Sequence, residues 1–388
     1  MIAPARRAAF EVVRRVFEEA AYADRALASA VEGLDDRDRA LAQRLAYGTV
    51  QRTRTIDFGI EQLGKRPVRK LDPPVRTALR LGGYQLAWTD LPVHAVVDDA
   101  VELVRVARRE RAVPFTNAVM RRLAQGFRGL VASLPDGPVK ESYPDWIAEV
   151  WTRDFGAEAA LSLMRAQNEP PGLEVHSAEP VGEATDVPGA YVVERVDPTR
   201  MRAMSRASQL AAVVVGSQPG ERVLDACAAP GGKTLLLRGD VTAVELHPGR
   251  AAHLAEEMPS NVTVVNADAR DLPEGGFDRS LVDAPCSGLG VLARRPDLRW
   301  RARPLPDLQS ELLRAAAERT KSGGTIVYAV CTLNADENEA VVDALGLAVE
   351  PLGAEWPQYA HPSRPEFLLT RPDRDRTSGF FIARLRAA

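Results

Sequence analysis

Two cysteines stand where a protein could use them for covalent chemistry. Cys286 follows the apolar segment RSLVDAP, and Cys331 ends the apolar segment GTIVYAVC. Short runs of this kind, rich in Val, Ile and Leu, are typical of buried strands. A single cysteine is most often a small buried apolar residue. Two cysteines at the ends of two neighbouring strands favour a chemical role instead, because a thiolate is a strong nucleophile.

Acidic residues end the other strands of the same region. From Gly220 onward the sequence alternates short strands with helical patterns, which is typical of parallel βαβ units. The expected strands are RVLDACA, TAVEL, VTVVNAD, RSLVDAP and GTIVYAVC. Ligands of such sheets bind outside the carboxyl ends of the strands. We therefore expect the five residues that end the strands to meet in one crevice: Asp225, Glu245, Asp268, Asp283 and Cys331.

The stretch DACAAPGGKT resembles a phosphate-binding loop but does not match one, because Cys227 takes the place of its first glycine. We expect a turn from the strand that ends at Asp225 into a helix near Lys233, with glycines that let the backbone approach a ligand. Glu245, 20 residues after Asp225, is placed to bind both hydroxyls of a ribose. Asp268 is placed to receive an adenine amino group. The pattern predicts an adenosine ligand, and the alternative is an unrelated turn between strand and helix.

An adenosine cofactor and a thiolate together suggest methylation of a pyrimidine. Carbon 5 of the ring is a weak nucleophile, so an enzyme first adds a thiolate to carbon 6 and then transfers a methyl group from S-adenosylmethionine. We expect Asp283 to contact N3 and the amino edge of the base. No CxxC pair or nearby histidine completes a zinc site, so we expect no metal. His247 and His253 are interpreted as surface or helix residues, and the thiol of Cys227 as structural.

Composition limits the class of protein. The chain has 388 residues, is 45% hydrophobic and has three widely separated cysteines, which argues against a disulfide framework and for a reducing cytoplasm. No apolar run approaches the roughly 20 residues that span a bilayer. The acidic, amphipathic first segment is typical of a domain's first helix and not of an export signal. We expect a cytoplasmic monomer that has no contact with membranes.

The composition and the expected secondary structure change along the chain. Residues 1–130 read as helices and carry 23 Lys and Arg against 16 Asp and Glu, which indicates either contact with nucleic acid or a solvated arginine surface. Residues 131–145, with three prolines, are predicted to be a linker. Residues 146–208 read as a small α+β module, and residues 209–388 as an α/β domain.

Several motifs together resemble a known family. VLDACAAPGGKT, DAPCSGLGVLARRPDLRW, GGTIVYAVCTLNADENE and SGFFIARL look like the motifs of the RsmB/Sun (Fmu) family of ribosomal RNA cytosine-5 methyltransferases. RDRALAQRLAYGTVQR and FTNAVMRRL are similar to the NusB-like RNA-binding domain of that family. The resemblance implies an all-α NusB-like domain, a small α+β RNA-facing module and a Rossmann-like class I S-adenosylmethionine-dependent methyltransferase domain.

Carried over by position, the resemblance makes Cys331 the nucleophile and Cys286 its helper in proton removal or product release. DNA methyltransferases use the cysteine after proline, and on that rival assignment Cys286 would attack. Asp283 serves both the base and the cofactor. The other residues implied around S-adenosylmethionine are Cys227, Ala228, Ala229, Pro230, Gly231, Gly232, Lys233, Glu245 and Asp268.

The resemblance makes RNA the expected partner, with ribosomal RNA first and transfer RNA as the alternative. We expect the helical domain and the arginine-rich run from Ala293 to Pro304 to neutralise phosphates, with Trp300 packing or stacking, although a solvated loop is the alternative for that run. A non-enzymatic RNA assembly factor with a decayed site is a further alternative. The chain departs from the family pattern at Val330, at Ser378, in RAMSRASQL, in a short middle module and in a short helix after Lys233.

Overall fold

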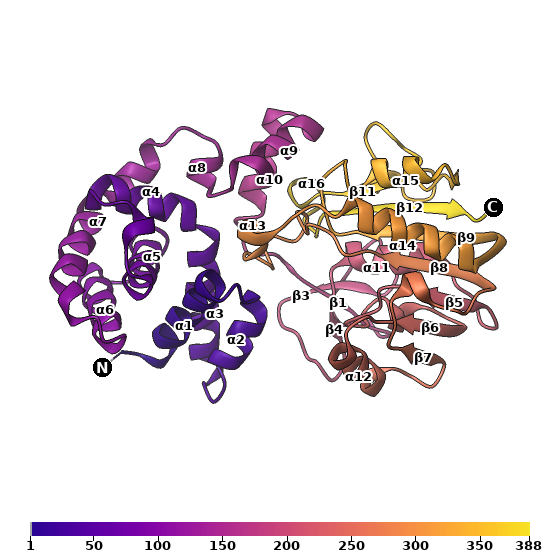
Figure 1. Cartoon of the computed structure of the whole chain (residues 1–388), viewed down its shortest axis with the longest axis horizontal. Coiled ribbons are helices and arrows are strands. Elements are labelled where there is room, and N and C mark those ends of the chain that lie inside the picture. The colour runs from indigo at the N-terminus through magenta and orange to yellow at the C-terminus, as the bar shows by residue number, and fades with distance from the viewer. Residues whose placement is uncertain (1) are drawn as a thin grey trace. The chain divides into compact units, whose positions relative to one another are not determined.

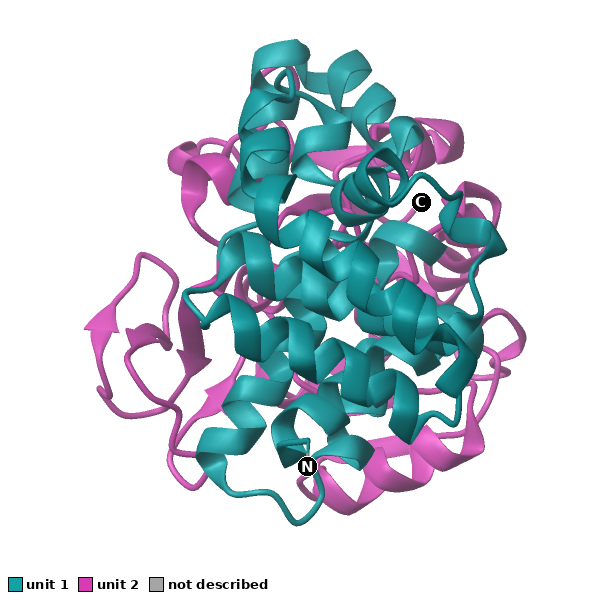
Figure 2. Ribbon diagram, turned by 90° about the vertical axis from the view of Figure 1, so that its left-hand side faces the viewer, with its two compact units in different colours: residues 1–169, 292–301 teal, residues 170–291, 302–388 magenta. Residues whose placement is uncertain are grey.

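The computed structural model describes residues 2–388, and the chain divides into two compact units (Figure 2). Unit 1 contains residues 1–169 together with residues 292–301, and unit 2 contains residues 170–291 and 302–388. The chain therefore leaves unit 2 for ten residues and then returns to it.

Unit 1 is built from amphipathic helices that bury their apolar faces in one core. Asp35 begins α3 by accepting a hydrogen bond from the Asp38 N–H at 2.8 Å, the usual role of an N-cap side chain. Gly48 lets α3 and α5 approach closely, since a Cβ there would lie 2.0 Å from the Tyr84 ring. The α-helices of this unit (Figure 1) are α1 (Pro4–Glu18), α2 (Ala23–Ala30), α3 (Asp36–Gln51), α4 (Thr53–Gly64), α5 (Pro73–Trp88), α6 (Val93–Val106), α7 (Val113–Ser133), α8 (Pro138–Glu141), α9 (Asp145–Phe155), α10 (Ala157–Ala166) and α13 (Leu298–Arg301), with 3-10 turns η1 (Val68–Lys70) and η2 (Glu110–Ala112).

Unit 2 begins with a small antiparallel sheet in the order β2-β3-β1-β4. Its strands are β1 (Leu173–His176), β2 (Glu183–Ala184), β3 (Ala190–Val193) and β4 (Arg202–Ala203). Helix α11 (Arg206–Val215) follows, and Ser205 caps it by accepting from the Ser208 N–H. Gln209 on this helix donates to the carbonyl of Val175 at 3.1 Å, which ties α11 to the small sheet. The unusual sequence RAMSRASQL therefore still provides a capped helix.

The second sheet of unit 2 holds the strands expected from the sequence. Its order is β10-β12-β9-β8-β5-β6-β7, with β11 paired to β12. Strands β7, β6, β5, β8 and β9 are mutually parallel, and β12 runs antiparallel to β9. Their bounds are β5 (Arg222–Asp225), β6 (Asp240–Val244), β7 (Val262–Val265), β8 (Phe277–Asp283), β9 (Thr320–Val330), β10 (Ala348–Glu350), β11 (Leu368–Thr370) and β12 (Phe380–Arg386).

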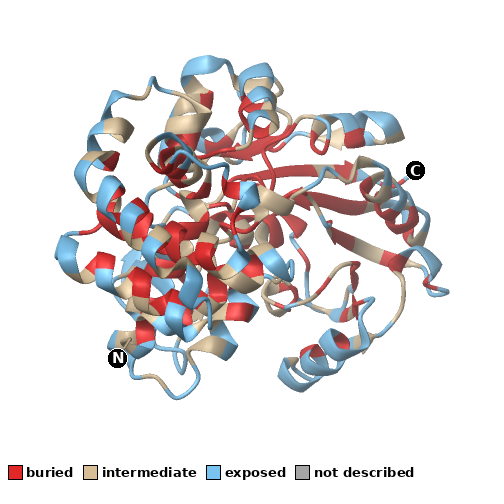
Figure 3. Ribbon diagram, turned by 60° about the vertical axis from the view of Figure 1, so that its left-hand side comes forward, coloured by how far each residue is buried: buried red, intermediate tan, exposed pale blue. Residues whose placement is uncertain are grey.

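Helices cover this sheet, and α11 and α14 both pack on β8 and β9. Figure 3 shows that the central strands are almost entirely buried, as expected for a parallel sheet covered on its faces. The remaining helices of unit 2 are α12 (Pro248–Glu257), α14 (Pro306–Arg319), α15 (Glu339–Leu345) and α16 (Pro372–Asp375), with 3-10 turns η3 (Thr234–Leu236), η4 (Ala269–Asp271) and η5 (Pro357–Tyr359).

The predicted fold class is confirmed: an all-helical N-terminal part, a small sheet and an α/β domain follow one another. The compact units nevertheless divide the chain differently from the predicted domains. The expected linker, residues 131–145, contains the end of α7 and all of α8, and α9 and α10 belong to unit 1. Two of the three prolines lie at helix starts: Pro138 is the first residue of α8, where its missing N–H costs nothing, and Pro144 directly precedes α9. Within residues 2–388 no helix is both long enough and apolar enough to cross a membrane.

Candidate active site

The glycine turn begins where β5 ends. Gly231 has φ +95°, and a Cβ there would lie 2.6 Å from a Leu254 methyl group, so only glycine fits this position. The helix expected near Lys233 is instead the three-residue 3-10 turn η3, which ends at Leu236. The sequence also predicted that this helix would be short, and it is limited to one 3-10 turn because β6 already begins at Asp240.

Asp225 lies at the base of this turn and is 1% exposed. Its Oδ2 accepts a hydrogen bond from the Thr234 hydroxyl at 2.7 Å, whereas its Oδ1 is buried without a hydrogen-bond partner. Burial raises the pKa of Asp225 to about 6, although the Thr234 hydrogen bond acts against the shift. The unpartnered oxygen marks a place at the carboxyl edge of the sheet where a polar ligand group fits.

Glu245 follows β6 and is buried, and its Oε1 accepts the His247 N–H at 2.7 Å and pairs with Arg250 at 2.8 Å. The next residue, Leu246, is the most exposed large apolar side chain of residues 2–388, at 56%. An acidic group beside an exposed apolar side chain suits a nucleoside, whose ribose is polar and whose base has an apolar face. Leu246 was missed from the sequence, because TAVEL reads simply as the end of a buried strand.

Asp268 lies just beyond the end of β7 and caps η4 by accepting the Arg270 N–H at 2.9 Å. Both of its oxygens also bond the Arg270 guanidinium, at 3.0 and 2.7 Å. The hydrogen bonds from Arg270 lower the pKa of Asp268 and keep it a carboxylate. The expected contact between Asp268 and an adenine amino group stays a prediction.

Lys233 and Asp283 form an ion pair at the centre of the carboxyl edge. The Lys233 Nζ lies 2.6 Å from Asp283 Oδ2, and the same ammonium lies 5.0 Å from the centre of the Phe380 ring. Asp283 is the last residue of β8, next to β5, so the pair spans two neighbouring strand ends. Phe380 comes from SGFF, and its role beneath the lysine was not foreseen from the sequence.

The two predicted cysteines meet. Cys286 Sγ lies 3.4 Å from Cys331 Sγ, and both residues are free of disulfides and of intermediate burial. The hydrogen bond from Cys286 lowers the pKa of Cys331, although burial and the negative charge of Asp283 act against the shift, and the positive charge of Lys233 acts with it. The same hydrogen bond, followed by burial and by the negative charge of Glu337, raises the pKa of Cys286. The arrangement thus favours a thiolate at Cys331 and a thiol at Cys286.

Glycines hold the loop between the cysteines against its neighbours. The Gly290 N–H donates to the Cys331 carbonyl at 3.0 Å, and the Gly379 N–H donates to the Gly290 carbonyl at 2.8 Å. A Cβ on Gly290 would lie 2.0 Å from the Gly379 carbonyl oxygen, so two backbones touch here. Ser378, where the family pattern has aspartate, accepts the Thr370 hydroxyl through its carbonyl, which any residue type provides.

Cys227 differs from the other two cysteines. Burial and the nearby carboxylates of Asp225 and Asp283 raise the pKa of Cys227 well above its ordinary value. A thiol of this kind is a poor nucleophile, which is consistent with its interpretation as structural. His253 is largely exposed beside Glu257, and within residues 2–388 no group of three or more His, Cys, Asp or Glu side chains could hold a metal ion.

The arginine-rich run is not a uniformly exposed surface, because Arg299 is buried while Arg303 is exposed, and its predicted contact with RNA stays a prediction. Arg299 is fully buried in unit 1, where it donates to the Gln167 carbonyl at 2.8 Å and lies over the Tyr143 ring at 3.9 Å. Trp300 Nε1 donates to the Val50 carbonyl at 2.8 Å, and its ring packs against the Phe17 ring with the ring centres 6.4 Å apart. The charge count of the run was misleading because it does not reveal that Arg299 completes the hydrogen bonding of unit 1.

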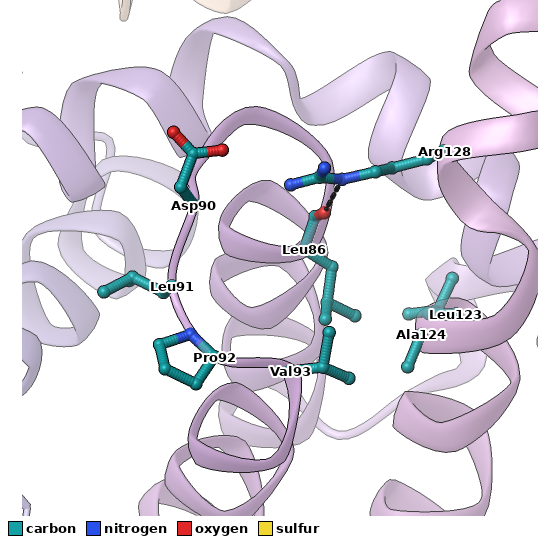
Figure 4. Close-up of a pocket in the computed structure, with 8 residues that line it drawn as sticks. All are labelled: Leu86, Asp90, Leu91, Pro92, Val93, Leu123, Ala124 and Arg128. Carbon is teal, nitrogen blue, oxygen red and sulfur yellow. Dashed lines mark hydrogen bonds between the residues drawn. The ribbon is translucent and has the colours of Figure 1, made fainter.

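A hollow of about 370 Å³ lies elsewhere in unit 1, where α5 ends (Figure 4). Arg128 on α7 donates to the carbonyls of Leu86 and Thr89, each at 2.6 Å, and thereby satisfies the last carbonyls of α5. None of the predicted site residues lines it. Its lining residues are Leu86, Asp90, Leu91, Pro92, Val93, Leu123, Ala124 and Arg128.

A covered parallel sheet, a glycine turn after β5 and an acidic residue after β6 define unit 2 as an S-adenosylmethionine-dependent methyltransferase. The predicted cofactor is confirmed. The residues present fit it: Glu245 and Leu246 suit the nucleoside, and Asp225 Oδ1 is an unpartnered acceptor at the same edge that could take a hydrogen bond from the cofactor.

Comparison with known proteins gives the family. Residues 212–386 match the model for 16S rRNA methyltransferase RsmB/F, and residues 3–125 match the NusB family. A Synechocystis protein named probable ribosomal RNA small subunit methyltransferase B is 32% identical over 99% of both chains. A putative methyltransferase of Mycobacterium tuberculosis is 34% identical over 99% of this chain and 96% of its own. The chain belongs to the RsmB/F family of 16S rRNA methyltransferases, which confirms the resemblance.

Solved structures share the fold. The structure titled PH0851 matches with a TM-score of 0.81 at 21% identity and covers 100% of this chain and 99% of its own. NSun6 from Pyrococcus horikoshii with SFG matches with a TM-score of 0.53 at 20% identity, covering 64% of this chain and 99% of its own. At these identities the likeness shows the fold alone.

Proposed function

We propose that this chain forms 5-methylcytosine in ribosomal RNA, with Cys331 as the nucleophile that adds to carbon 6 of the cytosine. The observation that carries the proposal is the pair of sulfur atoms 3.4 Å apart beside the Lys233–Asp283 ion pair. A thiolate and a neighbouring thiol are the two groups that addition and later elimination require.

The first step needs a thiolate and an acid. Cys331 Sγ forms a bond to carbon 6, and the electrons of the carbon 5–carbon 6 double bond move toward N3, which takes up a proton. Asp283 is assigned to N3 and the amino edge, and its partner Lys233 supplies positive charge and a proton at 2.6 Å from the carboxylate. The resulting enamine makes carbon 5 nucleophilic. S-adenosylmethionine, when bound, supplies the methyl group.

The second half of the reaction restores the ring. As the Cys331 sulfur leaves carbon 6, it takes the thiol proton of Cys286, 3.4 Å away, and the Cys286 thiolate so formed takes the proton from carbon 5. The electrons of that C–H bond re-form the double bond, and N3 returns its proton to Lys233. Cys286 begins as the thiol of the pair, because its pKa is raised by the hydrogen bond to Cys331 and by burial. It can take up the carbon 5 proton only after it has given its own proton to the departing Cys331 sulfur.

The choice of Cys331 over Cys286 as nucleophile rests on the hydrogen bond between the two thiols, which lowers the pKa of Cys331 and raises the pKa of Cys286. Glu337 further disfavours a thiolate at Cys286, whereas at Cys331 the positive charge of Lys233 is opposed by burial and by Asp283. The rival assignment, in which the cysteine after proline attacks, would require the less acidic thiol to ionise first. The substrate class rests on the relatives: the Synechocystis and Bacillus subtilis proteins, 32% and 29% identical, are both named probable ribosomal RNA small subunit methyltransferase B.

Covalent trapping tests the proposal. RNA that contains 5-fluorocytosine is incubated with the protein and S-adenosylmethionine, and the adduct is measured for the native chain, Cys331→Ala and Cys286→Ala. Fluorine cannot leave as a proton does, so the nucleophile stays attached. We expect an adduct with the native chain that only Cys331→Ala abolishes. Loss with Cys286→Ala alone would reverse the roles, and no adduct with ribosomal or transfer RNA would contradict the proposed reaction.

A further inference from the structure

Glu337 is a buried carboxylate that no step of the proposed reaction uses. It lies in TLNADENE, between the end of β9 and the start of α15, and it is 0% exposed. No lysine or arginine side chain forms an ion pair with it among the described residues. A buried carboxylate without a cation is costly unless hydrogen bonds satisfy its oxygens.

Neutral donors from separate segments surround this carboxylate. Its Oε1 accepts the Ser287 N–H and the Gln309 amide, each at 2.9 Å, and the Leu305 N–H at 3.1 Å. Its Oε2 accepts the Ser287 hydroxyl and the Asn334 amide. One side chain therefore joins the loop after β8, the start of α14 and the loop after β9.

Two of these contacts adjoin the cysteines. Ser287 directly follows Cys286, and Thr332, which directly follows Cys331, has its hydroxyl 3.4 Å from Glu337 Oε2. The two hydroxyls also lie 2.7 Å from each other. Glu337 therefore fixes the backbone just beyond both cysteines, and with it the distance between the two sulfur atoms.

The charges around the pair are unevenly placed. At Cys331 the opposite charges of Lys233 and Asp283 act against each other. At Cys286 the negative charge of Glu337 has no such counterpart, and Glu337 also acts on the buried Tyr328, whose hydroxyl donates to the Glu337 carbonyl at 2.6 Å. A negative charge favours the protonated form of a nearby thiol. The charge of Glu337 thus disfavours a second thiolate at Cys286, which must be protonated when Cys331 attacks.

We propose that Glu337 is a positioning residue that keeps the shared proton on Cys286 and so leaves Cys331 as the thiolate. The inference rests on the proposed roles of the two cysteines. It assigns to Glu337 no contact with RNA or with cofactor.

Thiol alkylation tests this without RNA or cofactor. The full-length protein is treated briefly with iodoacetamide at a series of pH values, and labelling of the Cys331 and Cys286 peptides is followed by mass spectrometry. In the native protein we expect Cys331 to be labelled first, from lower pH. In Glu337→Gln, which keeps the shape but removes the charge, we expect the ratio of Cys331 to Cys286 labelling to fall roughly tenfold, equivalent to one pKa unit.

Glu339→Gln is the matched control. Glu339 begins α15 two residues away and pairs with His361 at 2.6 Å, so its change alters packing in the same region without altering the charge that acts on Cys286. The labelling ratio should stay at its native value. An unchanged ratio in folded Glu337→Gln would overturn the inference.

Ser287→Ala decides the matter if Glu337→Gln does not fold. This variant keeps the carboxylate and removes one hydroxyl that holds the Cys286 loop, so we expect a smaller fall in the ratio, roughly threefold. No fall would overturn the inference. A native protein in which Cys286 is labelled first would contradict the proposed roles of the cysteines themselves, which separates that failure from failure of the Glu337 inference.

Discussion

Glu337 in unit 2 and Arg299 in unit 1 are both charged, both fully buried and both bonded to several segments of chain. The partners of Glu337 include the residue beyond Cys286 and the residue beyond Cys331. The partners of Arg299 are carbonyls, an amide oxygen and the Tyr143 ring, and none is chemically reactive. A buried charge thus indicates function when its partners adjoin reactive groups, and otherwise it indicates architecture.

The largest expected effect is the loss of Arg299. Arg299→Ala leaves the carbonyls of Gln51 and Gln167 without this donor and opens a cavity beside Tyr143. We expect unfolding of unit 1 to become easier by about 3–5 kcal/mol, measured by chemical denaturation. Arg303→Ala, an exposed arginine of the same run, is the control and should change stability by less than about 0.5 kcal/mol.

The contrast between Glu337 and Arg299 would be contradicted if Arg299→Ala changed the reactivity of Cys331 or Cys286. Iodoacetamide labelling of Cys331 and Cys286 in folded Arg299→Ala should match the native ratio. A changed ratio would mean that the architectural charge also acts on the site.

The second expected effect concerns Asp225, a buried carboxylate with one side-chain hydrogen bond and one unpartnered oxygen. Its pKa is about 6 in the folded protein and ordinarily 3.8, so between these values the folded state binds a proton that the unfolded state does not. Stability from this group is therefore present below about pH 4 and is lost as pH rises to about 6. The loss is of the order of 2–3 kcal/mol.

Asp225→Asn should remove this pH dependence while keeping an acceptor for Thr234. We expect the variant to gain stability relative to the native protein between pH 4.5 and about pH 7, as measured by urea unfolding at each pH. If the free energy of unfolding depended on pH in the same way in both proteins, the raised pKa of Asp225 would be contradicted.

The smallest expected effect is at Gly290, where contact is between backbones and no charge is involved. Gly290→Ala places a Cβ against the Gly379 carbonyl, so the loop that holds Cys286 must shift. We expect a loss of about 1–2 kcal/mol in stability and a lower rate of adduct formation with 5-fluorocytosine RNA. Gly249→Ala in α12, where a Cβ would meet nothing within 4 Å, is the control and should be neutral or slightly stabilising.

The strand ends could be predicted from the sequence because parallel strands end at one edge of their sheet. Asp225, Glu245, Asp283 and Cys331 lie at or directly after those ends, and two cysteines on such ends already favoured a reactive pair. Apolar periodicity likewise sufficed for the helices of unit 1. In both cases the signal is local, because a strand or an amphipathic helix is encoded by its own residues.

The roles of Glu337 and Arg299 could not be predicted, because they depend on neighbours that lie far away in sequence. The hydrogen-bond donors to Glu337 come from three separate segments, so the local sequence TLNADENE does not indicate its role. Arg299 is one of several arginines in its run, and only the carbonyls of Gln51 and Gln167 distinguish it from the exposed Arg303. The helix after Lys233 is short for a local reason, because too few residues separate it from β6.

The placement of residues 292–301 in unit 1 has a consequence for how the chain is made. The helices of unit 1 up to residue 169 leave the ribosome first, but Arg299 and Trp300 follow only after residues 170–291 have been synthesised. At roughly 5–20 residues per second this delay is on the order of 6–24 s. During that interval the carbonyls of Val50 and Gln167 await their donors, so the first-made part of the protein is finished only late in translation.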